Sequence, residues 1–299
     1  MSIAVPSSES KAAKSTSSAS SAQSHLVPDF TRLDDGPLWF QNRAKAAWDE
    51  FQSQPMPGLK HEAWRYSSAK RLALDALHTA AAPSEADKQQ AIAQSHGLEK
   101  TSAKFIFVND VLVHVETKAL PQGIICLPFA DALKSHGDIL EQYLMKREAQ
   151  LGSEKFAALH LAHVRAGVVV IAPKNSVLED PIEVFHWTSG DGALVFPHTL
   201  IVTGDHAQVT VVDHHGSLHD EATQSIAVAD FVAGPGSRIT YVNAQELSLK
   251  SRALHISSTT VGRDASVKAL QLHLGAAFSR NETVSDLIGE GARSEMLGV

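Results

Sequence analysis

The 299-residue chain has one cysteine, Cys126. A lone cysteine excludes an internal disulfide, and it cannot by itself anchor a metal cluster or a structural zinc ion. We therefore expect Cys126 to be a small, buried apolar side chain. The sequence also has no apolar run near the roughly 18 residues that a spanning helix needs, so we expect no membrane partner.

Positive charge is in short supply as well. Lys and Arg total 26 against 33 Asp and Glu, which gives a net charge of −7. Binding nucleic acid requires concentrated positive charge, so nucleic acid is not an expected partner. Residues 1–24 lack the layout of a secretory signal, which favours a cytoplasmic location, and the serine-rich stretch predicts a disordered tail over 1–30.

The sequence pattern of residues 31–165 predicts an α-helical region that contains one β-hairpin. Apolar spacing indicates helices over 36–51 and, with an interrupted stripe, over 129–163. A third helix begins at Ser84, where Asp87 forms a near capping box, and Gly97 supplies its stop. Two apolar runs flank Asn109 and Asp110 within 104–115, which is typical of a hairpin.

Residues 166–299 contain a repeat of strand and turn. Four similar turns carry a small residue at Ala207, Ser237, Ala265 and Ala292, and these residues are 30, 28 and 27 positions apart. A period near 28 that carries two strands is too short for a propeller blade and favours a parallel β-helix with two strands per coil. The alternative is a β-sandwich whose turns happen to share that spacing. Ser294 breaks the apolar alternation after the fourth turn.

The repeat also predicts that the β-helix is incomplete at its C-terminus. The last turn opens a coil that stops within its first strand at Val299, with no polar capping segment. We therefore expect a fragment with an open end that aggregates or pairs with a second copy of itself.

Three stretches carry a resemblance to a known family. Residues 57–66 read Pro-Gly-Leu-Lys-His-Glu-Ala-Trp-Arg-Tyr, residues 156–182 lead from a helix through Gly167-Val-Val-Val-Ile-Ala-Pro173, and residues 198–214 place a glycine turn between two strands. In this order they resemble the SufB/SufD family of iron–sulfur cluster assembly proteins. The Lys60–Tyr66 signature is similar to the SufD branch, although His160 stands where that family usually has asparagine.

The resemblance implies a mainly β protein, a right-handed parallel β-helix preceded by a helical and hairpin region. It implies a non-catalytic scaffold that pairs with a SufB-like subunit and associates with a SufC-like ATPase. The family's Lys-Cys-Ser-His-Gly motif has no counterpart here, and Cys126 lies far upstream of its place. We therefore expect no cofactor on this chain alone, with iron or an iron–sulfur cluster held only in the complex.

Two other functions stay open at this point. One is a carbohydrate-active β-helix enzyme, and the other is a β-solenoid binding module with an unrelated partner. The sequence has no Gly-x-Ser-x-Gly nucleophile and no phosphate-binding loop, so it predicts no catalytic residue.

Five of the 16 histidines lie between residues 198 and 219. Imidazoles on one sheet face bind transition metals, and nearby aspartates orient or join them. His198 and His214 are the candidate metal ligands of this group. The alternative is that these histidines face solvent without a function, and adjacent residues such as His214 and His215 point to opposite faces of a strand. The group comprises His198, His206, His214, His215 and His219.

The family-signature residues form the second candidate site. Trp, Tyr and Arg dominate protein interfaces, so this segment is a candidate partner-docking surface. The alternative is a helix-to-loop junction in which Trp64 and Tyr66 pack on the core while His61 and Glu62 cap backbone groups. The candidates are Lys60, His61, Glu62, Trp64 and Tyr66.

Overall fold

The computed structural model describes residues 36–58, 61–67, 69–72, 74, 77–118 and 120–299. The predicted serine-rich tail and Lys60 lie outside the described residues. Among the described residues, no helix is both long and apolar enough to cross a bilayer.

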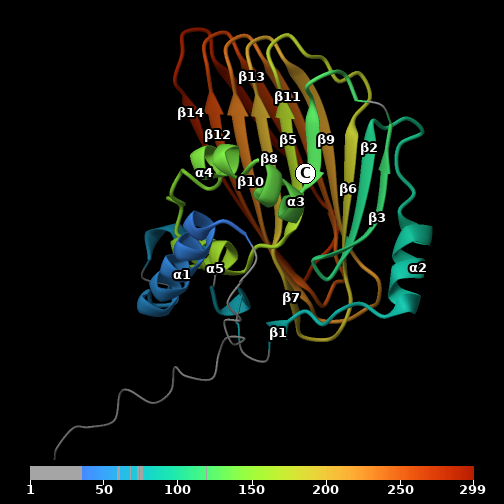
Figure 1. The fold of residues 1–299 in the computed structure, drawn as a ribbon. Helices are drawn as coiled ribbons and strands as arrows, with labels where there is room; N and C mark the ends of the chain where they lie inside the picture. The colour runs from blue at the N-terminus through green and yellow to red at the C-terminus, as the bar shows by residue number, and fades with distance from the viewer. Residues whose placement is uncertain (1–35, 59–60, 68, 73, 75–76, 119) are drawn as a thin grey trace, which may run out of the picture.

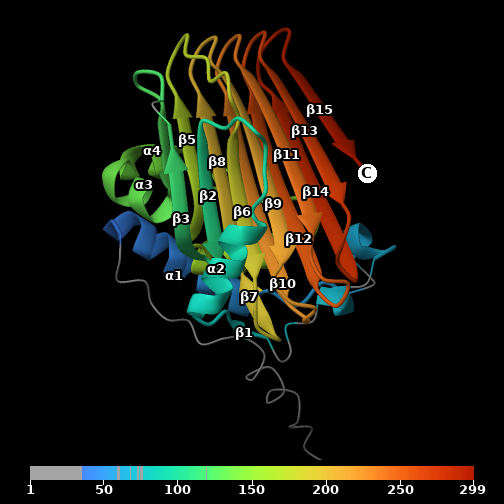
Figure 2. The ribbon, with the colours of Figure 1, turned by 90° about the vertical axis from the view of Figure 1, so that its right-hand side faces the viewer.

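Two large sheets wind into a β-solenoid (Figures 1 and 2). The first sheet has the order β4 (Ile125–Pro128), β5 (Ala166–Ala172), β8 (Pro197–Thr203), β10 (Gln224–Ala233), β12 (Arg252–Val261) and β14 (Phe278–Leu287), with β7 (Ala193–Val195) beside β10 and β1 (His78–Thr79) beside β7. The second has the order β3 (Val111–Thr117), β2 (Ala103–Val108), β6 (Ile182–Thr188), β9 (Gln208–Ser217), β11 (Arg238–Glu246), β13 (Ser266–His273) and β15 (Arg293–Gly298).

The register of the second sheet reproduces the repeat that the turns predict. Gln208 lies opposite Arg238, Arg238 opposite Ser266 and Ser266 opposite Arg293, all in parallel pairs. These steps equal the spacings of the four turns, so the parallel β-helix is confirmed and the β-sandwich is wrong. Ser294 does not interrupt the last strand, because it pairs with Val267 within β15.

Each predicted turn contains one residue in the left-handed region. The φ angles are 58° at His206, 67° at Gly236, 56° at Asp264 and 72° at Gly291. The backbone N–H of each of the first three donates to a carbonyl of the next coil, at 2.8–2.9 Å. The repeated backbone turn therefore forms a hydrogen-bonded ladder along one corner of the solenoid.

The predicted hairpin is present and is part of the solenoid. Asn109 and Asp110 have φ angles of 50° and 61°, as a two-residue hairpin turn requires, and β2 pairs antiparallel with β3. Strand β2 also pairs in parallel with β6, from Ala103 opposite Ile182 onward. The hairpin from the N-terminal half thus supplies the first strands of the second sheet.

The helices cover both outer faces of the solenoid (Figures 1 and 2). The predicted segment 129–163 is helical in three separate pieces. The helix predicted from Ser84 is confirmed with its capping box, but it ends at Gln94 rather than at Gly97. The first sheet is covered by α1 (Leu38–Ser53), α3 (Phe129–Ser135), α4 (Gly137–Tyr143) and α5 (Glu154–His163), the second by α2 (Glu85–Gln94), with short 3₁₀ turns at Glu62–Trp64 and Ala69–Leu72.

The interior of the solenoid is divided into an apolar part and a polar part. Strand alternation turns Val209 and Val211 inward, where they pack with Ile239 and Val267. Further along the same strands, the inward positions are polar, beginning with Asp213 and His215. The polar part of the interior is where the candidate site lies.

Candidate functional site

An interior polar cluster fills the solenoid beside its apolar core. We define it as His186 on β6, Asp213 and His215 on β9, Tyr241 on β11 and His255 on β12, all of them no more than 5% exposed. They share the inward face because each lies an even number of residues from a buried apolar neighbour on its own strand. Three coils thus contribute side chains to one buried polar site.

Asp213 is the centre of this cluster. Its Oδ2 accepts hydrogen bonds from Thr199 Oγ1 at 2.5 Å and from Tyr241 Oη at 2.9 Å, and His186 Nε2 lies 3.3 Å from its Oδ1. Burial alone would raise the pKa of this carboxyl, but the His186 contact and the hydroxyl donors lower it well below its usual range. Asp213 is therefore a buried carboxylate.

The two histidines that follow it are neutral. Burial lowers the pKa of His215 to about 3, although Asp213 opposes the shift. Burial likewise lowers the pKa of His255 to about 4. The Tyr241 pKa is raised well above its usual range by burial and by the Asp213 charge, so its hydroxyl keeps its proton.

A second histidine site lies outside the solenoid, under the helices. His160 on α5 places Nδ1 2.8 Å from the Ile226 carbonyl oxygen and Nε2 3.1 Å from His198 Nδ1. His198 Nε2 in turn lies 3.4 Å from Asp230 Oδ2. Asp230 also accepts from the Met145 N–H at 2.8 Å and from Ser258 Oγ at 2.6 Å. This network joins α5, the loop before it, and strands β8, β10 and β12.

The other predicted metal ligand, His214, lies on the opposite side of the solenoid. Its ring stacks on Phe185 with centroids 4.3 Å apart, and its Nε2 is 3.4 Å from Glu183 Oε1. Glu183 is fully buried, and its Oε1 also accepts from the Leu98 N–H at 2.9 Å. Gly97 lacks a side chain because a Cβ there would lie 2.1 Å from Glu183 Oε2. That close approach, rather than a helix stop, is why position 97 is glycine.

The structure therefore does not bring the two predicted metal ligands together. His198 belongs to the first sheet and pairs with Asp230, whereas His214 belongs to the second and pairs with Glu183. Among the described residues, no group of three or more His, Cys, Asp or Glu is arranged to hold a metal ion. Metal binding by His198 or His214 stays a prediction.

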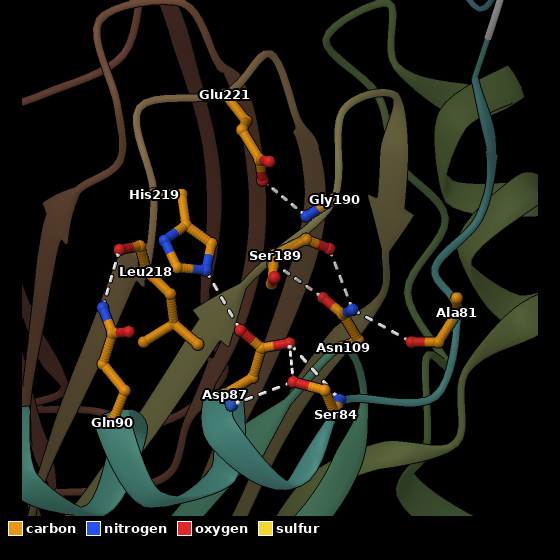
Figure 3. Close-up of polar contacts among 10 residues, drawn as sticks. All are labelled: Ala81, Ser84, Asp87, Gln90, Asn109, Ser189, Gly190, Leu218, His219 and Glu221. Carbon is orange, nitrogen blue, oxygen red and sulfur yellow. Dashed lines mark hydrogen bonds and ion pairs between the residues drawn. The ribbon is translucent and has the colours of Figure 1, made fainter.

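Of the remaining predicted histidines, His206 occupies a turn, and His219 fixes a helix to the solenoid. Figure 3 shows His219 facing Asp87, with Nε2 3.0 Å from Oδ1. Gln90 donates to the Leu218 carbonyl at 3.0 Å from the same helix (Figure 3). Asp87 is also the capping-box partner of Ser84, so one carboxylate both caps α2 and holds it on the β9–β10 loop.

The family-signature segment divides into a buried and an exposed part. Trp64 is fully buried, its Nε1 donates to the Gly152 carbonyl at 2.7 Å, and the Arg280 guanidinium lies 4.0 Å from its ring centroid. Tyr66 is 92% exposed, which is contrary to the packed position expected for it at a helix-to-loop junction. His61 and Glu62 are also exposed. A role of this segment in docking stays a prediction.

Cys126 is buried on β4, and burial raises the pKa of its thiol to about 12. The thiolate is the reactive form, so this cysteine is inert at neutral pH. It packs inside the solenoid with the apolar core, as the sequence predicts.

Three members of the interior polar cluster were missed in the sequence, namely His186, Tyr241 and His255. A signal exists for His186. When the chain is aligned in the register of its own repeat, His186 lies opposite His215, His215 opposite Gln245 and Gln245 opposite His273. Such a column of polar residues at inward positions is detectable once the period and the inward phase are both known.

The fold and the site define a class of protein: a parallel β-solenoid with a helical cover and a polar interior. Family models match nearly the whole of the described chain. The SufBD protein N-terminal region matches residues 35–184, and the SufBD core domain of the SUF system for FeS cluster assembly matches residues 185–299. The chain belongs to the SufBD family of iron–sulfur cluster assembly proteins, which confirms the resemblance.

Individual relatives are distant but match over most of this chain. It is 21% identical to the iron–sulfur cluster assembly protein SufD of Bacillus subtilis, over 91% of this chain and 63% of that protein. It is 24% identical to a SufBD family protein of Synechocystis, over 86% and 59%, and 22% identical to SufB of Bacillus subtilis, over 92% and 61%. The chain thus spans about three fifths of the length of these relatives.

Proposed function

We propose that this chain acts as a SufD-type scaffold subunit, without turnover of its own, in a cytoplasmic iron–sulfur cluster assembly complex. Its partners would be a SufB-like subunit, bound through the solenoid, and a SufC-like ATPase. Any iron or cluster would be held in the complex rather than by this chain alone.

One observation carries the proposal: the two family models together span residues 35–299 and meet inside the solenoid. The signature segment adds support for the SufD branch. Trp64 of that segment contacts the guanidinium of Arg280 on β14, so the segment packs directly on the solenoid. The same family match favours a scaffold over a carbohydrate-active enzyme and over a module with an unrelated partner.

Co-expression with SufB-like and SufC-like subunits tests the partnership. We expect one complex on size-exclusion chromatography that contains all three chains. Recovery of this chain alone, with the other two together in a separate peak, would contradict the proposal. A polysaccharide cleavage screen on the purified chain is expected to give no products.

Iron content tests the role within the complex. We expect a SufB–SufC pair prepared without this chain to lose iron loading while sulfur transfer to it persists. The matched control adds this chain as the His96→Asn variant, because His96 is exposed and lies outside the family-signature segment. If the iron content of the SufB–SufC pair does not change when this chain is omitted, the scaffold role is contradicted.

A further inference from the structure

Positive charge collects around one exposed aromatic ring at the end of the family-signature segment. Within residues 61–72, Arg65, Lys70 and Arg71 stand against a single carboxylate, Glu62, although the whole chain has a net charge of −7. All three cations are exposed, and so is Tyr66, at 92%. We call Arg65, Tyr66, Lys70 and Arg71 the basic surface.

The fold leaves the charge of the basic surface uncompensated. In the part of the chain that the structure describes, none of its three cations lies within ion-pair distance of a carboxylate. Exposed cations on the solenoid do have such partners, since the Nζ atoms of Lys250 and Lys268 lie 2.9 Å and 3.4 Å from carboxylate oxygens of Asp220 and Glu295. Uncompensated cations on an otherwise acidic protein attract an anionic partner.

The turn that carries Tyr66 is anchored on both sides. The Arg280 guanidinium on β14 donates to the Ala63 carbonyl at 3.0 Å and to Ser67 Oγ at 3.1 Å. The guanidinium carbon of Arg65 lies 5.5 Å from the centroid of the Tyr66 ring, so the two side chains are already paired in the free chain. Side chains presented from a fixed turn lose less conformational entropy when a partner binds.

The basic surface continues onto the solenoid. The guanidinium carbon of Arg71 lies 5.9 Å from the ring centroid of Phe278, the first residue of β14. Arg252 on β12 lies opposite Phe278 in the sheet register and is partly exposed, which adds a fourth cation beside the surface. Figure 2 shows the short segment that carries the surface beside β14. A partner that binds the turn therefore also reaches the first sheet.

The residue types decide which kind of partner fits. Tyr and Arg dominate the binding energy of protein interfaces, and guanidinium groups pair with carboxylates through two parallel hydrogen bonds. A nucleic acid is disfavoured, because the net charge of −7 repels a polyanion and the basic surface offers one ring for base stacking.

We propose that the basic surface binds an acidic segment of a partner protein. On the function proposed above that partner is the SufB-like subunit, because the surface reaches the solenoid through which that subunit would bind. To this extent the inference rests on the proposed function.

Fluorescence polarisation of a labelled acidic peptide, with glutamate at every second position, tests the surface on the full chain alone. We expect saturable binding that weakens as salt is added, and binding at least about tenfold weaker for the same peptide with glutamine in place of glutamate. Tyr66→Ala is expected to weaken binding at least about tenfold as well. Binding of both peptides with equal affinity overturns the proposal.

A charge reversal separates the basic surface from the net charge of the chain. The double variant Arg65→Glu/Lys70→Glu is expected to weaken peptide binding at least about tenfold. The matched control Lys100→Glu/Lys134→Glu changes the net charge by the same amount at exposed lysines elsewhere, and it is expected to weaken binding less than about threefold. An equal loss in the two variants, or binding of a single-stranded RNA with the same dependence on Tyr66, overturns the proposal.

Co-expression of the same variants with the SufB-like subunit separates this inference from the scaffold role. We expect Tyr66→Ala and Arg65→Glu/Lys70→Glu to reduce the amount of complex on size-exclusion chromatography. A complex that forms while the acidic peptide does not bind would overturn the inference and leave the scaffold role standing. Peptide binding that needs Tyr66, without any complex, would exclude the SufB-like subunit as the partner and contradict the scaffold role.

Discussion

His160 Nε2 lies 3.1 Å from His198 Nδ1, and this contact fixes the protons of a buried chain of four groups. The Ile226 carbonyl only accepts, so His160 Nδ1 donates to it and His160 Nε2 accepts from His198. His198 Nε2 then faces Asp230, whose two oxygens already accept from Met145 and Ser258. His198 Nε2 lies 3.4 Å from Asp230 Oδ2 at the end of this chain.

The first prediction follows from that chain. His160→Leu leaves the Ile226 carbonyl and the His198 N–H without partners, and it is expected to lower the free energy of unfolding by about 3 kcal/mol. His160→Asn keeps one donor and one acceptor in a shorter side chain, and it is expected to cost about 1 kcal/mol. Urea unfolding measures both. An equal loss in the two variants would show that packing rather than hydrogen bonding holds this site.

The second prediction concerns pH. In the unfolded chain His215 and His255 take up protons near their ordinary pKa of 6.5, but in the folded chain only near 3 and 4. Between these values the unfolded state binds more protons, so the free energy of unfolding falls as the pH decreases from about 7 to 4. For His255 alone the full displacement corresponds to about 3 kcal/mol.

Urea unfolding at pH 7.5, 6, 5 and 4.5 measures this slope. His255→Phe removes one of the two groups and is expected to flatten the pH dependence, whereas the exposed His96→Asn leaves it as in the unchanged chain. A slope identical in all three proteins would mean that the interior histidines do not set the acid sensitivity.

The third prediction compares two glycines. Gly167 is the second residue of β5 and has a φ of 120°, and a Cβ there would lie 1.7 Å from the His198 carbonyl oxygen. Gly167→Ala is therefore expected to cost at least about 3 kcal/mol, because the clash is with backbone that other strands hold in place. Gly58→Ala is expected to change stability by less than about 0.5 kcal/mol. Thermal unfolding of the pair measures the difference, and similar melting temperatures would contradict it.

The fourth prediction separates folding from docking in the family-signature segment. Trp64→Ala removes a fully buried ring, its hydrogen bond to Gly152 and its contact with Arg280, and is expected to cost about 3–5 kcal/mol. Tyr66→Ala is expected to leave stability within about 0.5 kcal/mol. If Tyr66→Ala also leaves assembly with a SufB-like subunit unchanged, this tyrosine is not a docking residue.

Local features were predicted well where one short segment decides them. The Ser84 capping box and the Asn109-Asp110 turn depend on neighbouring residues only, and both form as expected. The role of Gly97 was misjudged for the opposite reason. It is set by Glu183, a residue of another strand that no local pattern connects to it.

The candidate site was predicted less well. Histidine density in the sequence drew attention to residues 198–219, but strand alternation and the helical cover distribute these histidines over both sheets, a turn and a loop. The interior polar cluster instead joins residues from different strands, with Tyr241 14 positions from His255 and 28 positions from Asp213. These residues meet because each occupies a position of its strand that points into the solenoid.

The sequence by itself determined the period, the order of strands and turns, and the family. It could do so because a solenoid repeats one local unit, and each unit contains the same backbone turn. The tertiary structure decided which histidines are buried, which carboxylate each one faces, and where the solenoid interior is polar. These properties depend on the stacking of coils and on the helices that exclude water, and both arise only when distant segments pack together.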